Sequence, residues 1–104
     1  MIQITTNSKN LSILASGHSS YAQKGSDIVC AAVSILMYSY AAELMRQCSR
    51  VDIRDDGYRF EISTDRRNVR TTTAYDTVIS GLRMLADTYR NNITITEESK
   101  WQKH

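Results

Sequence analysis

A chain of 104 residues with 41% hydrophobic content has the size and apolar content of one compact domain rather than several. The formal net charge is only +2, and the basic residues form no long run, which disfavours a dedicated nucleic-acid-binding protein. We find no apolar run near the roughly 20 residues that a membrane span requires and no signal peptide, so we expect a cytoplasmic protein without a membrane partner.

Alternating apolar residues predict a β-hairpin at the start of the chain. Ile2 and Ile4 alternate with polar neighbours, and the alternation resumes at Leu11 after a polar turn. The next segment, GHSSYAQKGS at 17–26, is small, polar and bounded by glycines. We therefore expect two strands followed by a surface loop, where functional residues tend to lie.

A long helix is predicted to follow this loop. Asp27 is a suitable N-cap, and apolar residues continue for several turns from Ile28 to Met45. They occupy more than one face of the helix, so a single sheet does not hide them all. This surplus predicts a second packing surface, and we expect a homodimer formed through this helix.

A second hairpin, a second helix and a short strand complete the predicted elements. Apolar residues alternate through 51–62 around an Asp-Asp-Gly turn. Residues 64–73 are polar and basic without a period, and apolar residues then recur at helical spacing through 75–89. Alternation at 93–95 predicts the last strand.

The resulting order, ββαββαβ, predicts an α+β fold. We expect a two-layer sandwich in which two helices cover one face of a mainly antiparallel sheet. Residues 1–96 are assigned to a single domain and residues 97–104 to a polar C-terminal tail. The pattern leaves the strand order open.

The two cysteines are candidates for chemistry or packing rather than for a disulfide. Cys30 and Cys48 fall within one predicted helix, where a rise of about 1.5 Å per residue separates them by roughly 27 Å. Free thiols suit a reducing compartment. The chain has no Cys-x-x-Cys pair, and His18 with Cys30 supplies too few ligands for zinc, so we expect neither a metal nor another cofactor.

Cys30 is the candidate nucleophile. With Asp27 as N-cap it is the third helical residue, where unpaired backbone N–H groups and the positive end of the helix dipole favour a thiolate. The same N–H groups offer a site for the negative oxygen of a tetrahedral intermediate. His18 is the only histidine before the C-terminal residue and is the candidate base.

Each of these residues also has a simpler interpretation, and composition and spacing do not decide between them. A cysteine such as Cys30 in a buried helix is often a small core residue, and Asp27 needs no role beyond capping. His18 and Tyr21 in a polar loop are compatible with plain solvation. Ser34, one turn after the cysteine, is compatible with a hydrogen bond to the preceding turn.

The motifs around these residues resemble those of a known family. Gly-His at 17–18 followed by GSDIVCAAVS at 25–34 is similar to the signature of the ribosomal-processing cysteine proteases, the Prp family. The segment GLRMLADTYRNNITI at 81–95 resembles the end of that family, so the likeness covers nearly the whole chain. The sequence departs from the family at Ser19, where alanine is usual, and at Arg90, where proline is common.

The resemblance implies a cysteine endopeptidase that removes a short N-terminal extension from a large-subunit ribosomal protein, the one numbered twenty-seven, or acts on a related phage or mobile-element target. His18 and Cys30 match the catalytic dyad of the family. Gly17, Asp27 and Ser34 match other motif positions, expected around the substrate and in support of the dyad. The implied partners are the extended precursor and a second copy of the chain.

The implied mechanism is an acyl-enzyme reaction. The Cys30 thiolate attacks a peptide carbonyl, and His18 acts first as base and then as acid to the leaving amine. We expect the substrate pocket between the loop 17–26 and the first helix, with Tyr21 of the loop as a candidate substrate contact.

A function of another class stays open as an alternative. Arg66, Arg67 and Arg70 form a basic stretch that suits a non-enzymatic module binding ribosomal RNA or a ribosomal protein, with Cys30 buried and inert. A solvated charged loop is the simpler interpretation of the same residues. Nucleic acid is therefore the less expected partner.

Overall fold

The computed structural model describes residues 1–17, 27–48 and 50–98. The elements follow the predicted order ββαββαβ: β1 (Ile2–Asn7), β2 (Ser12–Ser16), α1 (Ile28–Gln47), β3 (Val51–Asp55), β4 (Arg59–Thr64), α2 (Val69–Thr88) and β5 (Ile93–Glu97).

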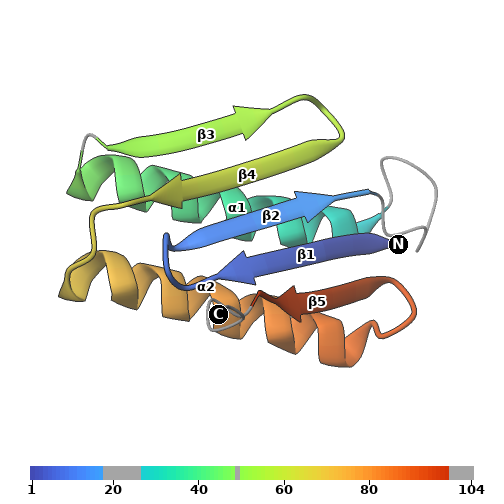
Figure 1. Cartoon of the computed structure of the whole chain (residues 1–104). Coiled ribbons are helices and arrows are strands. Elements are labelled where there is room, and N and C mark those ends of the chain that lie inside the picture. The colour runs from blue at the N-terminus through green and yellow to red at the C-terminus, as the bar shows by residue number, and fades with distance from the viewer. Residues whose placement is uncertain (18–26, 49, 99–104) are drawn as a thin grey trace.

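The five strands form one mixed sheet in the order β3-β4-β2-β1-β5. Three of its neighbouring pairs are antiparallel, and β5 lies parallel to β1 at one edge. Both helices cover the same face of the sheet (Figure 1). The predicted α+β sandwich with a mainly antiparallel sheet is therefore confirmed, and the pairing supplies the strand order that the sequence pattern left open.

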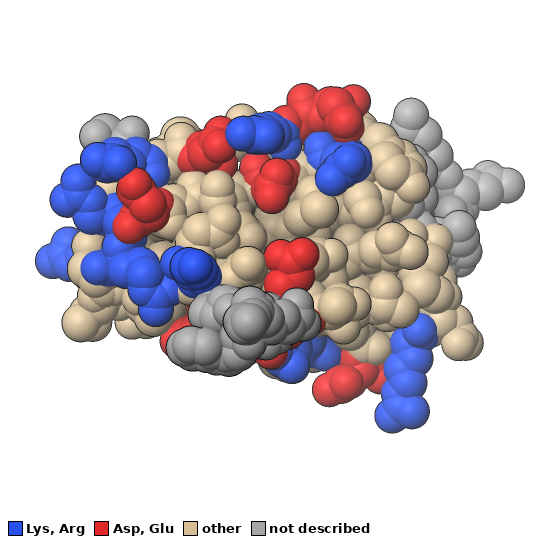
Figure 2. Space-filling view, viewed as in Figure 1, with Lys and Arg blue, Asp and Glu red and all other residues tan. Residues whose placement is uncertain are grey.

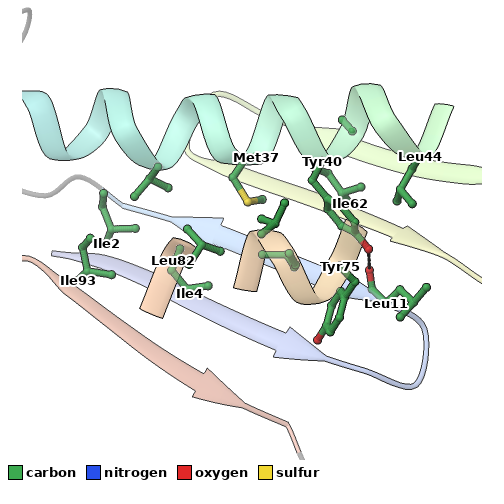
Figure 3. Packing of buried hydrophobic residues seen from close by; sticks show 14 of the residues in the cluster. Ile2, Ile4, Leu11, Met37, Tyr40, Leu44, Ile62, Tyr75, Leu82 and Ile93 are labelled. Carbon is green, nitrogen blue, oxygen red and sulfur yellow. Dashed lines mark hydrogen bonds between the residues drawn. The ribbon is translucent and has the colours of Figure 1, made fainter. Parts of the chain in front are cut away.

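The core lies between the sheet and the two helices. Ile4 and Ile62 face the helices from β1 and β4, and Met37 and Leu82 meet them from α1 and α2. Figure 3 shows these side chains converging. Side chains return to the same face every two residues in a strand and every three or four in a helix. The apolar residues of each strand and helix follow these spacings, so one apolar face of each element points into the core.

A buried hydrogen bond ties α1 to the β1–β2 turn. The Tyr40 hydroxyl donates to the carbonyl oxygen of Leu11 at 2.5 Å (Figure 3), and both residues are 0% exposed. Leu11 has a φ of 52°, an uncommon conformation for a non-glycine residue, and the Tyr40 hydroxyl supplies the hydrogen-bond donor that its buried carbonyl requires. Burial raises the pKa of Tyr40 above its usual range.

Helix α2 begins earlier than predicted. Residues 64–73 were expected to be irregular, whereas the helix starts at Val69. Asn68 and Thr71 form a capping box: the Asn68 side chain accepts the Thr71 N–H at 2.9 Å, and the Thr71 hydroxyl accepts the Asn68 N–H at 3.0 Å. That expectation was wrong because the capping pair supplies hydrogen-bond partners at the helix N-terminus, so the first turn forms without regularly spaced apolar residues.

Helix α1 is long and apolar although part of its surface is exposed. By length and composition it is able to cross a membrane, so the expectation that no apolar run approaches that size was wrong for Ile28–Gln47. The core helix of a globular domain passes the same test, and α1 packs on the sheet and on α2. Its outer face carries exposed residues with apolar side chains: Ile28, Ala31, Ile35, Tyr38, Ala42 and Met45.

Candidate active site

The first turn of α1 is organised by Asp27. Its Oδ1 atom accepts the backbone N–H groups of Val29 and Cys30, each at 3.0 Å, and its carbonyl oxygen accepts the N–H of Ala31 at 3.2 Å. The predicted N-cap is therefore confirmed. Cys30 is the third helical residue, and its side chain is partly exposed.

The same hydrogen bonds occupy the backbone N–H groups that were expected to bind the negative oxygen of a tetrahedral intermediate. The N–H groups of Val29 and Cys30 were expected to be open, but both donate to the Asp27 carboxylate. A negative substrate oxygen and this carboxylate compete for the same donors, since each N–H carries a single proton. These donors become available only when the Asp27 side chain turns away.

Cys30 opens onto a groove of about 740 Å³ beside α1. Cys30, Ser34 and Tyr38 lie four residues apart on the helix and form one wall. The helix and its N-cap contribute four more lining residues: Asp27, Ala31, Val33 and Met37. The rest of the lining comes from β1, the β2 strand and its end, and the β3–β4 hairpin: Ile2, Ala15, Ser16, Gly17, Asp55, Gly57, Tyr58, Arg59 and Phe60. The volume falls in the range of sites that take a small ligand or a short peptide stretch.

Gly17 is required at the mouth of this groove for a steric reason. Its φ is +89°, and an added Cβ would lie 2.5 Å from the carbonyl oxygen of Met1. Its N–H donates to the Tyr58 carbonyl oxygen at 3.2 Å, which joins the end of β2 to the start of β4. The residue directly before His18 in the chain is thus part of the groove lining.

The far wall of the groove is the tip of the β3–β4 hairpin. The Asp56 carboxylate accepts the backbone N–H groups of Arg59 at 2.7 Å and Tyr58 at 3.0 Å, and these bonds hold the pKa of Asp56 below its usual range. The rings of Phe60 and Tyr38 lie 5.2 Å apart and tilted, which links the hairpin to α1. The groove lining therefore includes an aromatic pair that joins the helix to the hairpin, together with the carboxylate of Asp55.

Four predicted site residues come together here: Gly17, Asp27, Cys30 and Ser34 all line the groove. His18, the predicted base, and Tyr21 lie outside the described residues. Within the described ranges no three His, Cys, Asp or Glu residues are placed to hold a metal ion.

Sequence reasoning missed the hairpin wall. Asp55, Tyr58 and Phe60 are about 25 to 30 positions from Cys30 in the sequence, and only the pairing of β4 with β2 brings them to the groove. Tyr38 carried a usable signal, since it repeats the four-residue spacing from Cys30. Cys48 lies just past the other end of α1, with its Sγ 3.8 Å from the Thr64 hydroxyl, in a packing position.

A protein-family model described as cysteine protease Prp matches residues 1–94. The chain belongs to this family. Two relatives named ribosomal processing cysteine protease Prp are similar to it. The one from Mycoplasma pneumoniae is 30% identical over 96% of this chain and 98% of its own length. The one from Mycoplasma genitalium is 29% identical over 84% of this chain and 88% of its own.

Solved structures of Prp proteins share the fold. The essential ribosomal processing protease Prp from S. aureus, in complex with a covalently linked product peptide, is similar with a TM-score of 0.85 and 26% identity. It covers 94% of this chain and 100% of its own. The S. aureus protease has also been solved with a substrate peptide, and that structure has a TM-score of 0.75 and 25% identity, covering 93% and 97%. The chain is therefore a cysteine protease of the ribosomal-processing Prp family.

Proposed function

We propose that this protein is an endopeptidase in which Cys30 attacks a peptide bond held in the groove beside α1. The observation that carries the proposal is the position of Cys30: it is the third residue of a capped helix and opens into a groove of about 740 Å³. A thiol at a helix N-terminus lies at the positive end of the helix dipole, where its reactive anion is favoured. Cys48, at the opposite end of the same helix, lacks that setting.

The reaction begins when the Cys30 sulfur bonds to the carbonyl carbon and the carbonyl oxygen takes up the electron pair. Collapse of this intermediate breaks the C–N bond, and His18 gives the leaving amine the proton that it took from the thiol. Water then adds to the thioester and releases the acid and the free thiol. Gly17, which precedes His18 and lines the groove, supports this pairing.

Asp27 and Ser34 act as positioning residues in this account. In the free protein the Asp27 carboxylate accepts hydrogen bonds from the N–H groups of Val29 and Cys30. When substrate binds, the carboxylate turns away and the negative substrate oxygen accepts these hydrogen bonds instead. Ser34 is exposed one turn beyond Cys30, where a bound chain passes along the helix. Tyr21 is assigned a substrate contact from the loop.

The proposed substrate is a ribosomal protein precursor with an N-terminal extension, the large-subunit protein numbered twenty-seven, or a related target of a phage or mobile element. Support comes from the names of the relatives and from the peptide complexes of the S. aureus protease. The test incubates the purified protein with the extended precursor and, as control, with the same protein lacking the extension. The intact mass of the precursor should fall by the mass of the extension, and the mass of the control should stay unchanged. Absence of cleavage in both would direct the search to the second class of target.

A homodimer through α1 is part of the proposal. The exposed outer-face residues of α1 are spaced by three and four in turn, from Ile28 to Met45, which is the repeat of a helix-pairing seam. Two of the six are alanines, which allow close approach. Ile35→Glu should convert the protein to a monomer in sedimentation or light scattering. Met84→Glu on α2 is the matched control and should leave the mass unchanged; an unchanged mass in both variants contradicts the seam.

We also assign the protein to the cytoplasm, a proposal that rests on its two cysteines, neither of which forms a disulfide in the described structure. The non-enzymatic alternative loses its support because the chain belongs to a family of cysteine proteases. Its basic residues still need an explanation.

A further inference from the structure

The positive charge of the protein is concentrated at one end of the fold. Six of the ten Lys and Arg residues that the structure describes lie where α1 ends and α2 begins: Lys9, Arg46, Arg50, Arg66, Arg67 and Arg70, here called the basic end. Figure 2 shows this gathering of blue side chains at the left, where β4 leads into α2 in Figure 1. All six are exposed. The modest net charge of the whole chain hides this uneven distribution.

Hydrogen bonds between separate segments assemble the basic end. Arg67 donates to the Ser8 carbonyl oxygen in the β1–β2 turn, and Arg70 donates to Gln47 at the end of α1 at 3.5 Å. Arg50 pairs with Asp65 at 2.6 Å. The surface is therefore one face made from three separate parts of the chain, of which the sequence alone shows only the stretch with Arg66, Arg67 and Arg70.

Only part of this charge is neutralised within the protein. Asp65 and Glu43 pair with Arg50 and Arg46, and both pairs are solvent-exposed. Arg66 has no ion-pair partner within the described ranges. Exposed pairs of this kind hold their charges weakly, because water screens them, so an external anion competes for them.

The start of α2 carries its arginines against the helix dipole. Arg67 and Arg70 flank the N-cap Asn68, and no acidic residue lies in the first turn. Cations at a helix N-terminus add to its positive end and cost stability, where Asp or Glu would be stabilising. A sequence that places positive charge where local stability disfavours it is typical of a binding surface.

The proteolytic groove lies at the other end of α1. Cys30 is roughly 24 Å from Arg46 along the helix, at about 1.5 Å per residue. Two carboxylates, Asp27 and Asp55, line the groove against one cation, Arg59, and outside the basic end the described residues include nine acidic against four basic ones. A polyanion is therefore drawn to the basic end and repelled from the groove, so both sites can be occupied together.

We infer that the basic end binds the phosphate backbone of double-helical RNA while the groove remains open to peptide. Five of the six cations are arginines, whose planar guanidinium groups match phosphate oxygens. The described segments that carry these cations, 7–11, 44–48, 50–52 and 64–72, contain no aromatic residue on which unpaired bases would stack or that would anchor a protein interface. A broad cationic face without either feature fits a duplex read by shape and charge. The inference rests on the cations alone and holds whichever peptide is cut.

Fluorescence anisotropy with a labelled RNA duplex of about 16 base pairs tests this inference. The wild type should bind with an affinity that falls steeply between about 50 and 200 mM salt, because each phosphate contact releases counterions. Arg66→Glu/Arg70→Glu should weaken binding at least about ten-fold and lower the salt slope by about one per lost contact. Acidic residues suit the start of α2, so this variant should fold normally.

The matched control is Arg83→Glu/Arg90→Glu, which changes the net charge equally but lies away from the basic end. It should keep near-wild-type RNA affinity, and peptide cleavage should be unchanged in the basic-end variant. Equal loss in both variants would assign the binding to net charge and overturn the inference. Absence of RNA binding by the wild type would also overturn it. Competition by polyglutamate as strong as by RNA at equal charge would assign the surface to an acidic protein segment instead.

Discussion

The backbone N–H of Cys30 donates a 3.0 Å hydrogen bond to the carboxylate of Asp27, so the N-cap residue of α1 also occupies the backbone donors beside the proposed nucleophile. Asp27→Ala removes this cap and should lower the free energy of unfolding by about 1 kcal/mol. Asp27→Asn keeps an oxygen acceptor and should stay within about 0.5 kcal/mol of the wild type. Urea denaturation measures both, and equal losses would contradict the capping role.

Gly17 and Gly57 form a natural pair for testing backbone strain at the groove. Both have a φ near +89°, but an added Cβ at Gly17 meets the Met1 carbonyl oxygen at 2.5 Å, whereas at Gly57 nothing lies within 4 Å. Gly57→Ala should cost about 1 kcal/mol for conformation alone. Gly17→Ala should cost clearly more, because the clash adds to the same conformational term. Similar losses in thermal or urea unfolding would show that the first strand moves aside freely.

The regular elements were predictable because each has a strong local period. Ile2 and Ile4 alternate, and the apolar positions from Tyr75 onward recur at helical spacing, so element type and order were predicted correctly. The start of α2 was not, since its first turn is held by the Asn68–Thr71 capping box and not by apolar residues. Local periodicity gives no information about turns stabilised by side-chain caps.

Tyr40 should govern the response of stability to alkaline pH. Burial raises its pKa in the folded state, so its contribution is full below the unfolded value of about 10 and is lost as the pH rises above that. Tyr40→Phe leaves the buried Leu11 carbonyl without its donor and should cost about 1–3 kcal/mol at pH 7. In urea titrations above pH 10 the variant should lose stability less steeply than the wild type. Parallel pH profiles would contradict this role.

Ser34 should report on the path of the substrate. Ser34→Phe fills the groove one turn from Cys30 and should lower kcat/KM for peptide cleavage at least about ten-fold. Ser39→Phe places the same side chain on another exposed face of α1, in the furrow toward α2, and should leave cleavage near wild type. Circular dichroism confirms folding of both. Equal activity in both variants would place the bound peptide elsewhere.

The candidate site was predictable only in part, for a physical reason. The spacing of Asp27, Cys30 and Ser34 along one helix fixes their relation, so sequence reasoning found that wall of the groove. The opposite wall, with Tyr58 and Phe60, depends on which strands pair, and strand pairing is a long-range property that a single sequence leaves open. The basic end was predicted only in part: the sequence shows the stretch with Arg66, Arg67 and Arg70, whereas tertiary contacts bring Lys9, Arg46 and Arg50 to it.

The central claim is that Cys30, and not the second cysteine, cuts the peptide bond. The direct measurement follows the intact mass of the extended ribosomal precursor incubated with wild-type protein, Cys30→Ala or Cys48→Ala. The account predicts cleavage by the wild type and by Cys48→Ala, and none by Cys30→Ala, with all three folded to similar extents. Cleavage that persists in Cys30→Ala and disappears in Cys48→Ala would contradict it.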